Sequence, residues 1–342
     1  MARPCSSSGG LVVLFLSLCS IFLIVDSTDT KKPLIDAKLL NSKIQVKQTY
    51  KVGPEEQYKS VQAAIDAVPE GNSQWVVVHV KAGTYREQVV VPENKPYIYL
   101  RGNGKGKTTI VWDECSIDNT KSATFNLEAS NFIAFGVTFK NNAERDLPNL
   151  ARNQSVAAKV SGDKVAFYHC GFYSPHNTLF DHRGRHYYES CYIQGNIDFI
   201  FGRGQSLFQS CEIFVLPDGR NDILGSITAQ NRKSEKCTSG FVFLKGKVYG
   251  VGEVYLGRAN EPFSRVIFAN TYFSKTISPV GWTNWSYSGD TKGLMIGEHD
   301  CHGPGGDPKH RAEWARQFSK EEVEPFLGVD FINGSEWLPV YY

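Results

Sequence analysis

The sequence predicts an all-β protein whose strands form a right-handed parallel β-helix, a solenoid with short flanking helices. Short runs of aromatic and β-branched residues alternate with turns rich in Gly, Asn and Asp, which is the pattern of strands. Helical segments of about 10–15 residues, which would indicate alternating strands and helices, do not separate these runs. A short unit closes each β-rich segment and recurs every 20 to 35 residues, so the segments are expected to stack.

The recurring unit begins with a small or β-branched residue and has an aromatic or aliphatic residue two positions later. It occurs at 137–139, 170–172, 191–193, 211–213, 246–248 and 271–273. A β-propeller is the alternative repeat fold, but its blades need about 40–45 residues and four strands each. The spacing therefore favours a β-helix with one unit on each coil.

The first 27 residues have the features of a secretory signal peptide. Arg3 supplies a positive charge, residues 11–25 are apolar or small, and small residues follow at a cleavage site. A membrane anchor is the alternative, but this run is shorter than the roughly 20 residues that a spanning helix needs. Secretion is therefore expected, and Asn153, Asn284 and Asn333, which begin Asn-x-Ser sequons, are candidate glycan sites.

Residues 28–50 are polar and lack periodicity, which predicts a loose leader before one large domain at 51–342. An amphipathic helix is expected near 58–68, ended by Pro69. Strands are expected at 75–80, 97–100, 108–111, 132–139 and 165–172.

Two short helices are predicted near the C-terminus. Asp307 and Pro308 form an N-cap followed by proline, and Ser319 with Glu322 forms a capping box. We expect these helices to cover an end or an edge of the β-helix, because an exposed row of strand edges requires a cover.

The composition supports a packed core, since 41% of the residues are hydrophobic and 13% are aromatic. The net charge is only +2, and no run of Lys and Arg dominates the chain, which argues against a nucleic-acid partner.

Three cysteines stand at the start of successive repeat units: Cys170, Cys191 and Cys211. If they occupy the same place on neighbouring coils, they lie about 4.8 Å apart, within the Cα separation that a disulfide tolerates. Only neighbours can pair, so this argument leaves Cys170–Cys191 and Cys191–Cys211 both open.

Asp198 is the most conspicuous candidate for chemistry. It lies inside the apolar run 197–201, and an isolated buried charge is too costly to retain without a partner or an opening to solvent. A cation that offsets this cost, or a position in a cleft, is therefore expected.

Several motifs resemble those of the plant pectin methylesterases (pectinesterases), in the order of that family, from about residue 50 to the C-terminus. They are SVQAAIDAVP at 60–69, GTYRE at 83–87, QSVA at 154–157, GNIDFIFG at 195–202, ITAQ at 227–230, YLGR at 255–258 and the tryptophans at 282 and 285. The octapeptide around Asp198 is the most specific of these. An inhibitor-like helical region, which many plant members carry, does not precede the domain in this sequence.

The resemblance implies a right-handed β-helix that hydrolyses the methyl esters of galacturonate in pectin, without a metal or cofactor. It implies that Asp198 is the nucleophile, that Arg258 keeps it ionised through paired hydrogen bonds, and that Gln154 stabilises the oxyanion. It selects Cys191–Cys211 as the disulfide, and it implies a monomer with pectin, and a protein inhibitor of pectinesterases, as partners. The substrate-binding residues that it implies are Tyr85, Thr124, Phe199, Trp282 and Trp285.

The chain departs from the family in two places. The acid/base aspartate of the family is Asn177 here, 21 residues before Asp198, and the preceding glutamine is His176. An amide cannot supply a proton, and losing general acid/base catalysis typically costs about 10²–10⁴-fold in rate. His176 is a candidate replacement acid. After Arg258, the Pro-Trp of the family is Ala259-Asn260, which removes one sugar-stacking ring.

Two other functions are kept open by these observations. A pectin-binding protein without turnover would suit the loss of the proton donor at Asn177. A β-helix hydrolase or lyase acting on the polygalacturonate backbone would need a second carboxylate or a calcium site, for which only Asp218 and Asp222 are candidates.

Overall fold

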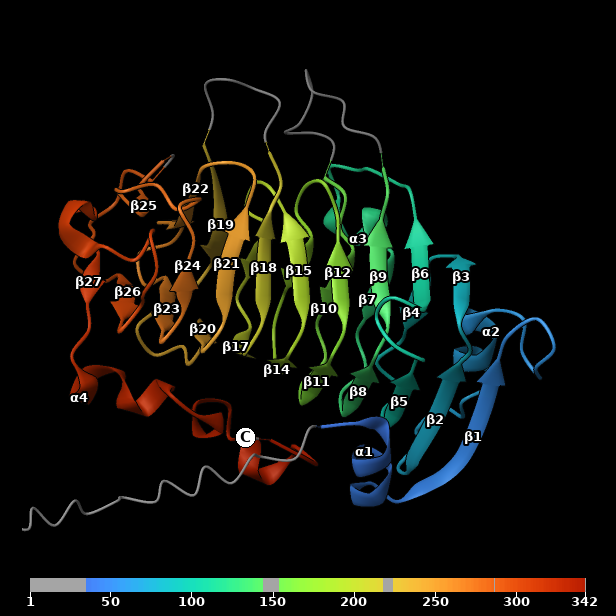
Figure 1. Cartoon of the computed structure of the whole chain (residues 1–342). Coiled ribbons are helices and arrows are strands. Elements are labelled where there is room, and N and C mark those ends of the chain that lie inside the picture. The colour runs from blue at the N-terminus through green and yellow to red at the C-terminus, as the bar shows by residue number, and fades with distance from the viewer. Residues whose placement is uncertain (1–34, 144–153, 218–223, 286, 342) are drawn as a thin grey trace, which may run out of the picture. The chain divides into compact units, whose positions relative to one another are not determined.

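Parallel strands wound into successive coils make up the protein in the computed structural model, which describes residues 35–143, 154–217, 224–285 and 287–341 (Figure 1). The predicted signal peptide, Asn153, Asp218 and Asp222 lie outside these described residues. The coils from β2 to β25 each contribute one strand to each of three sheets, while β1, β26 and β27 extend one sheet alone, and the ladders between neighbouring coils are parallel. The predicted fold class, a right-handed parallel β-helix, is confirmed.

The three sheets are named A, B and C, and their strands follow the order of the chain. Sheet A contains β1 (Val46–Val52), β2 (Trp75–Val80), β5 (Ile98–Arg101), β8 (Phe132–Phe135), β11 (Val165–Tyr168), β14 (Arg185–Glu189), β17 (Gln205–Gln209), β20 (Gly240–Leu244), β23 (Arg265–Ala269), β26 (Met295–His299) and β27 (Arg316–Gln317). Sheet B contains β3 (Gly83–Arg86), β6 (Thr108–Trp112), β9 (Thr138–Asn141), β12 (Gly171–Tyr173), β15 (Tyr192–Gly195), β18 (Glu212–Val215), β21 (Lys247–Gly250) and β24 (Tyr272–Phe273). Sheet C contains β4 (Val89–Val91), β7 (Phe125–Leu127), β10 (Ala158–Val160), β13 (Leu179–Asp181), β16 (Ile200–Gly202), β19 (Gly225–Gln230), β22 (Val254–Arg258) and β25 (Trp282–Thr283).

The repeat unit marks the corner between sheets A and B. The residue before the unit has a positive φ on each coil, for example +52° at His169, +50° at Ser190 and +53° at Ser210. This left-handed residue turns the chain while the apolar pattern continues around the inside of the corner. Residues 132–139 and 165–172, each predicted as one strand, are therefore two strands each, broken at Gly136 and His169.

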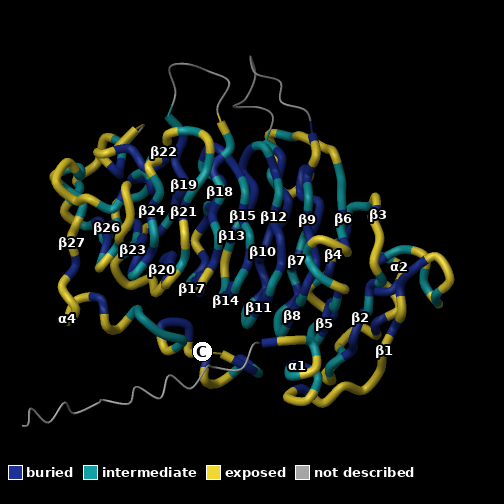
Figure 2. Tube along the Cα trace, viewed as in Figure 1, coloured by how far each residue is buried: buried dark blue, intermediate teal, exposed yellow. Residues whose placement is uncertain are grey.

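The space inside the coils is filled with apolar side chains. Figure 2 shows that much of the backbone of the coils belongs to buried residues. Stacked rings run along the axis from coil to coil. The ring centroids of Tyr188 and Phe208 are 4.5 Å apart, and those of Phe243 and Phe268 are 4.3 Å apart. This continuous apolar column explains why the repeats must stack, because a single coil cannot bury its own apolar face.

The cysteines also stack inside the coils, but the predicted Cys191–Cys211 disulfide is contradicted: Cys170, Cys191 and Cys211 are buried free thiols. The ladder does place Cys191 and Cys211 on neighbouring coils. Each thiol instead donates to main-chain carbonyls, Cys191 to Phe167 O at 3.4 Å and Cys211 to Tyr188 O at 3.4 Å. Burial raises the pKa of the Cys191 thiol well above its ordinary value, so it stays protonated and unreactive.

Thiol titration of the chain without its first 27 residues, unfolded in denaturant, is expected to find all six remaining cysteines free. Prior reduction should not raise this number, and it should not change the melting temperature. Four reactive thiols before reduction and six after it would show that one pair is bonded, and peptide mapping would identify the pair.

The N-terminal part of the described chain corrects the expectation of a loose leader at 28–50. Helix α1 (Ala37–Lys43) is capped by Asp36, and β1 then extends sheet A beside β2. Helix α2 (Val61–Asp66) confirms the predicted amphipathic helix, with Ser60 as its N-cap. A further helix, α3 (Asn119–Ser122), was not expected.

The predicted C-terminal helices are confirmed. They were expected to cover an end or an edge of the β-helix, and they also cover the outer face of sheet A. The elements are η2 (Pro308–His310), α4 (Lys320–Val323), η3 (Glu324–Phe326), η4 (Val329–Ile332) and η5 (Gly334–Glu336). Both halves of the Ser319–Glu322 capping box form. Phe331, Ile332 and Leu338 pack on outward side chains of sheet A such as Tyr168, whose hydroxyl donates to Val340 O at 2.6 Å. The outer face of sheet A is apolar and needs this cover.

A buried ionic network ties sheets A and C together beneath the site described below. Asp181 and His186 are fully buried, and the Oδ1 of Asp181 lies 2.9 Å from the Nδ1 of His186. Tyr188 and Ser206 also donate to the carboxylate, each at 2.9 Å. Burial alone would lower the pKa of His186, but the Asp181 carboxylate outweighs it, and the pKa is raised.

Because the folded-state pKa of His186 lies above its unfolded value of about 6.5, the imidazolium stabilises the fold fully below that pH. The contribution is lost as the pH rises through the folded-state pKa. Replacing His186 with Gln is expected to lower stability at pH 5 by about 3–5 kcal/mol, since a buried carboxylate loses its ion partner. The loss should be smaller at high pH.

Thermal or denaturant unfolding of wild type and His186→Gln between pH 5 and 9 measures this difference. The matched control is His310→Gln, because His310 is exposed. Equal losses at pH 5 and pH 9 would show that His186 acts only through packing.

Among the described residues, no helix has the length and hydropathy to cross a membrane.

Candidate active site

Strand pairing places Asn177 and Asp198 at equivalent positions on neighbouring coils. Leu179 faces Ile200 in the β13–β16 ladder, so the residues two positions earlier are also neighbours. Both residues lie in the turn two positions before a sheet C strand and have a positive φ, +58° at Asn177 and +46° at Asp198. Asn and Asp tolerate this conformation better than other residues with a side chain, and such strained backbone collects at functional sites.

Asp198 is held by groups from the next two coils. The Nε of Arg258, at the end of β22, lies 3.1 Å and 2.9 Å from its two carboxylate oxygens. Ser226, on the intervening strand β19, donates its hydroxyl to Oδ1, and its carbonyl accepts from the Asp198 amide at 2.7 Å. The side chains of Asp198 and Arg258 are 15% and 17% exposed, so the carboxylate is paired with a cation, largely desolvated and still open to a substrate.

The guanidinium geometry corrects the expectation of two parallel hydrogen bonds, because Nε alone serves both carboxylate oxygens. The Nη1 of Arg258 instead donates to the Oδ1 of Asn260 at 2.9 Å. Asn260 is one of the two family departures, and its amide therefore orients the arginine.

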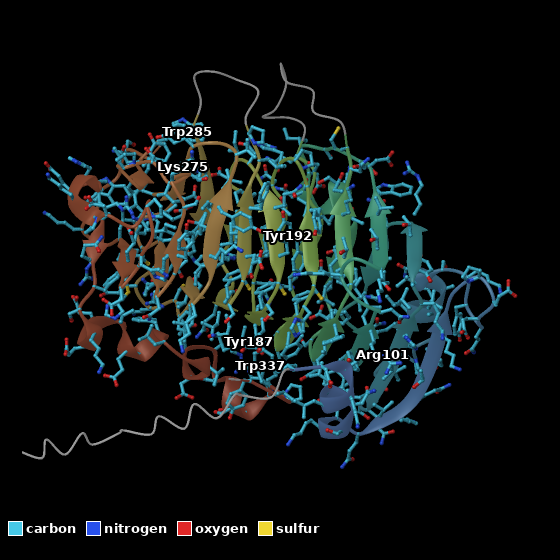
Figure 3. All side chains as sticks on the ribbon, in the orientation of Figure 1. Arg101, Tyr187, Tyr192, Lys275, Trp285 and Trp337 are labelled. Atoms are coloured by element: carbon cyan, nitrogen blue, oxygen red, sulfur yellow. The ribbon has the colours of Figure 1, made fainter. Side chains whose placement is uncertain are left out.

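Trp285 stands beside the same arginine. Its ring centroid is 5.8 Å from the Cζ of Arg258, and half of its surface is exposed. Figure 3 shows Trp285 near the upper end of the molecule. An exposed ring thus remains at the site although position 260 is not aromatic.

Gln154 and His176 lie on the coils that precede Asp198. The backbone of Gln154 pairs with Ser116, through hydrogen bonds of 2.9 Å and 3.2 Å. The adjacent Ser155 donates its amide and its hydroxyl to the carbonyl of His176, at 3.3 Å and 3.1 Å. The Oε1 of Gln154 is buried and has no hydrogen-bond partner among the described residues, so the side-chain amide is not committed to a structural bond on that side.

The structure does not bring every predicted residue to this site. Phe199 and Thr124 are fully buried inside the coils, where Thr124 donates to Lys140 O at 3.1 Å. Trp282 is also buried, and its indole N–H donates to Glu298 at 3.1 Å. Tyr85 lies on the edge strand β3 of sheet B, not on sheet C. None of these four residues offers an exposed ring or hydroxyl beside Asp198, so only Trp285 fits the expected substrate contact.

Three residues were missed by the sequence reasoning. Phe180 and Phe201 point outward from sheet C with their rings stacked at 4.6 Å, next to Asp198 along the strand direction. The sequence could have indicated the two phenylalanines, since each alternates with inward-facing residues of its strand. Ser226 could have been found only from its position directly before the ITAQ motif.

The donor set suits nucleophilic attack by a carboxylate on an ester. A search of the described residues for three or more His, Cys, Asp or Glu side chains able to hold one metal ion finds no such group. The site instead combines a paired carboxylate, an uncommitted amide and outward aromatic rings.

Comparison with known proteins agrees with this donor set. The family model described as Pectinesterase matches residues 51–335. The Arabidopsis thaliana protein described as probable pectinesterase 67 is 56% identical over 333 residues, covering 97% of this chain and 96% of that protein.

Solved structures of related proteins have the same fold. A pectin methylesterase from carrot superposes with a TM-score of 0.80 at 30% identity, covering 84% of this chain and 94% of that one. A pectin methylesterase from Aspergillus niger superposes with a TM-score of 0.72 at 26% identity, covering 84% and 95%. The chain belongs to the pectinesterase family of carboxylic ester hydrolases.

Proposed function

We propose that this protein is secreted and removes methyl esters from the galacturonate units of pectin in the plant cell wall, with Asp198 as the nucleophile. The observation that carries the proposal is the Asp198 carboxylate, paired with Arg258 at 2.9 Å in a mostly buried position that still reaches solvent. A desolvated carboxylate of this kind is a competent nucleophile for covalent catalysis.

In the first step, an oxygen of Asp198 attacks the ester carbonyl carbon, and the carbonyl electrons move onto its oxygen. The amide of Gln154, on the adjoining coils, is the candidate donor for that oxyanion. When the carbonyl re-forms, the bond to the methoxy group breaks, which leaves an anhydride between substrate and Asp198. Water then hydrolyses the anhydride, releasing the substrate carboxylate and regenerating Asp198.

The departing methoxide must take up a proton to become methanol. Asn177, beside Asp198 on the preceding coil, can donate a hydrogen bond but cannot release a proton. His176 is the nearest titratable residue in the chain and is mostly buried with Asn177. We infer that His176 or a water molecule supplies the proton and that turnover is weaker than with an aspartate at position 177.

A pectin-binding protein without turnover remains the second candidate function, because Asn177 is the observation that favours it. The experiment that separates the two measures methanol release from methyl-esterified pectin by the purified protein. Reducing ends and unsaturated products are measured in parallel, because backbone hydrolysis or a lyase reaction would release them instead of methanol. Binding to pectin without any of these products would support the second candidate.

A further inference from the structure

The strand that follows the nucleophile has an arginine at its far end. Asp198 lies two residues before β16, Phe201 points outward from the strand, and Arg203 follows directly after it. Five residues span at most about 18 Å, so Arg203 lies within the reach of an oligosaccharide that has one unit at Asp198. Phe180 and Phe201 form the surface between these two points.

Arg203 lines a pocket of about 440 Å³, within the range of small-ligand sites. The other lining side chains include Arg185, Gln205, Thr238 and Ser239, which are all polar. Hydroxyl and amide groups of this kind suit the hydroxyls of a sugar. The pocket therefore has the size and polarity to hold part of a sugar chain.

The two arginines of the pocket differ in their partners. Arg185 is neutralised by Asp163, with its Nε 3.0 Å from Oδ1. Arg203 is exposed, and within the described parts of the chain no carboxylate lies within ion-pair distance of it. Arg203 thus presents an uncompensated guanidinium to the pocket, a group that binds carboxylates in a planar, two-bonded geometry.

Neighbouring cations strengthen the positive potential here. Burial lowers the pKa of His182, and the charges of Lys159, Arg203 and Arg183 lower it further. Lys159 is paired with Glu128 at 2.6 Å, which leaves Arg183 and Arg203 as the exposed cations. An anionic group is therefore favoured at this end of β16.

We propose that Arg203 and its pocket bind the free carboxylate of an already de-esterified uronate residue while a neighbouring part of the same chain lies at Asp198. This rests on the proposed function for the substrate class. A methyl ester is neutral and a uronate is anionic, so a guanidinium distinguishes the two. The site would favour esters that lie near an existing free carboxylate.

The test measures the binding of a fully de-esterified oligogalacturonide by calorimetry at low and high salt. Arg203→Gln is expected to weaken binding about tenfold or more at low salt, because a hydrogen bond to a charged group is lost. The matched control is Arg183→Gln, which removes the same charge from an exposed neighbour that does not line the pocket. It should weaken binding less than threefold, and the difference should shrink in high salt. Asn333 lines the pocket and begins a sequon, so protein without N-glycans is used.

Equal weakening by the two variants, or no change in Arg203→Gln, would overturn the proposal. Binding of a fully methylated oligomer, measured with Asp198→Asn as the common background, should be unaffected by Arg203→Gln. Since the de-esterified ligand needs no turnover, the result does not depend on methanol release. A protein that binds as expected but releases no methanol would refute the proposed esterase reaction and leave the carboxylate site standing.

Discussion

Replacing Asp198 with alanine is expected to abolish methanol release, lowering kcat by at least about 10⁴-fold, because the covalent step then has no nucleophile. The fold should survive, since Asp198 is a turn residue at the surface of sheet C and not part of the apolar column. Assays of kcat with methyl-esterified pectin, beside circular dichroism and melting curves, measure both effects.

Ser226→Ala is the matched control for this change. It removes one hydrogen bond to the Asp198 carboxylate while leaving the ion pair with Arg258 intact. We expect a loss of about tenfold, as for one hydrogen bond to a charged group. If wild type and Asp198→Ala release methanol at the same low background rate, the esterase proposal fails and the protein is a pectin binder.

Replacing Asn177 with aspartate is expected to raise kcat by about 10²–10⁴-fold, because a carboxylic acid next to Asp198 can protonate the leaving methoxide. The position already has the required left-handed backbone, with φ at +58°, and aspartate tolerates that conformation as asparagine does. Two neighbouring carboxyl groups also disfavour double ionisation, which helps to keep one of them protonated.

The control for Asn177→Asp is Asn131→Asp, the same chemical change at another left-handed turn residue, with φ at +55°, away from the site. It should leave kcat unchanged. His176→Gln in the wild-type background tests the histidine separately. A histidine acid acts only while it is protonated, so activity that depends on His176 declines on the basic side of the wild-type pH profile and should be abolished when the residue is replaced. Full activity in His176→Gln would indicate that a water molecule protonates the leaving methoxide, or that the Asn177 amide stabilises it through a hydrogen bond.

The fold could be predicted because its cause is local and repeated. Each coil carries the same small or β-branched corner residue and the same inward aromatic or aliphatic residue, so stacking is the one arrangement that buries them all. Asp198 and Arg258 could also be identified as partners, since a carboxylate within an apolar run needs a cation. These inferences need only the order of the residues, the free-energy cost of exposing apolar side chains and the cost of burying an unpaired charge.

Alternation along the chain could not assign faces near the corners. Phe199 and Phe201 stand in the same run, yet Phe199 is buried in the coil and Phe201 lies outside. Phe199 still belongs to the turn that contains Asp198, and the strand begins only at Ile200, so the period of two that separates inward from outward side chains does not extend to Phe199. For the same reason, the strands at 132–139 and 165–172 were predicted without their breaks.

What the sequence by itself determined is the stacked β-helix, the Asp198–Arg258 pair and the absence of a proton-donating side chain at Asn177. Only the tertiary structure decided that Arg258 contacts the Asp198 carboxylate through Nε alone while its Nη1 donates to Asn260. It also decided that Ser226 donates a hydrogen bond to that carboxylate, and that Cys191 and Cys211 remain thiols. These contacts join residues on neighbouring coils, and their geometry depends on side-chain direction. Register sets which residues meet, but the direction of each side chain is set by packing across the coil, which no single segment of the chain encodes.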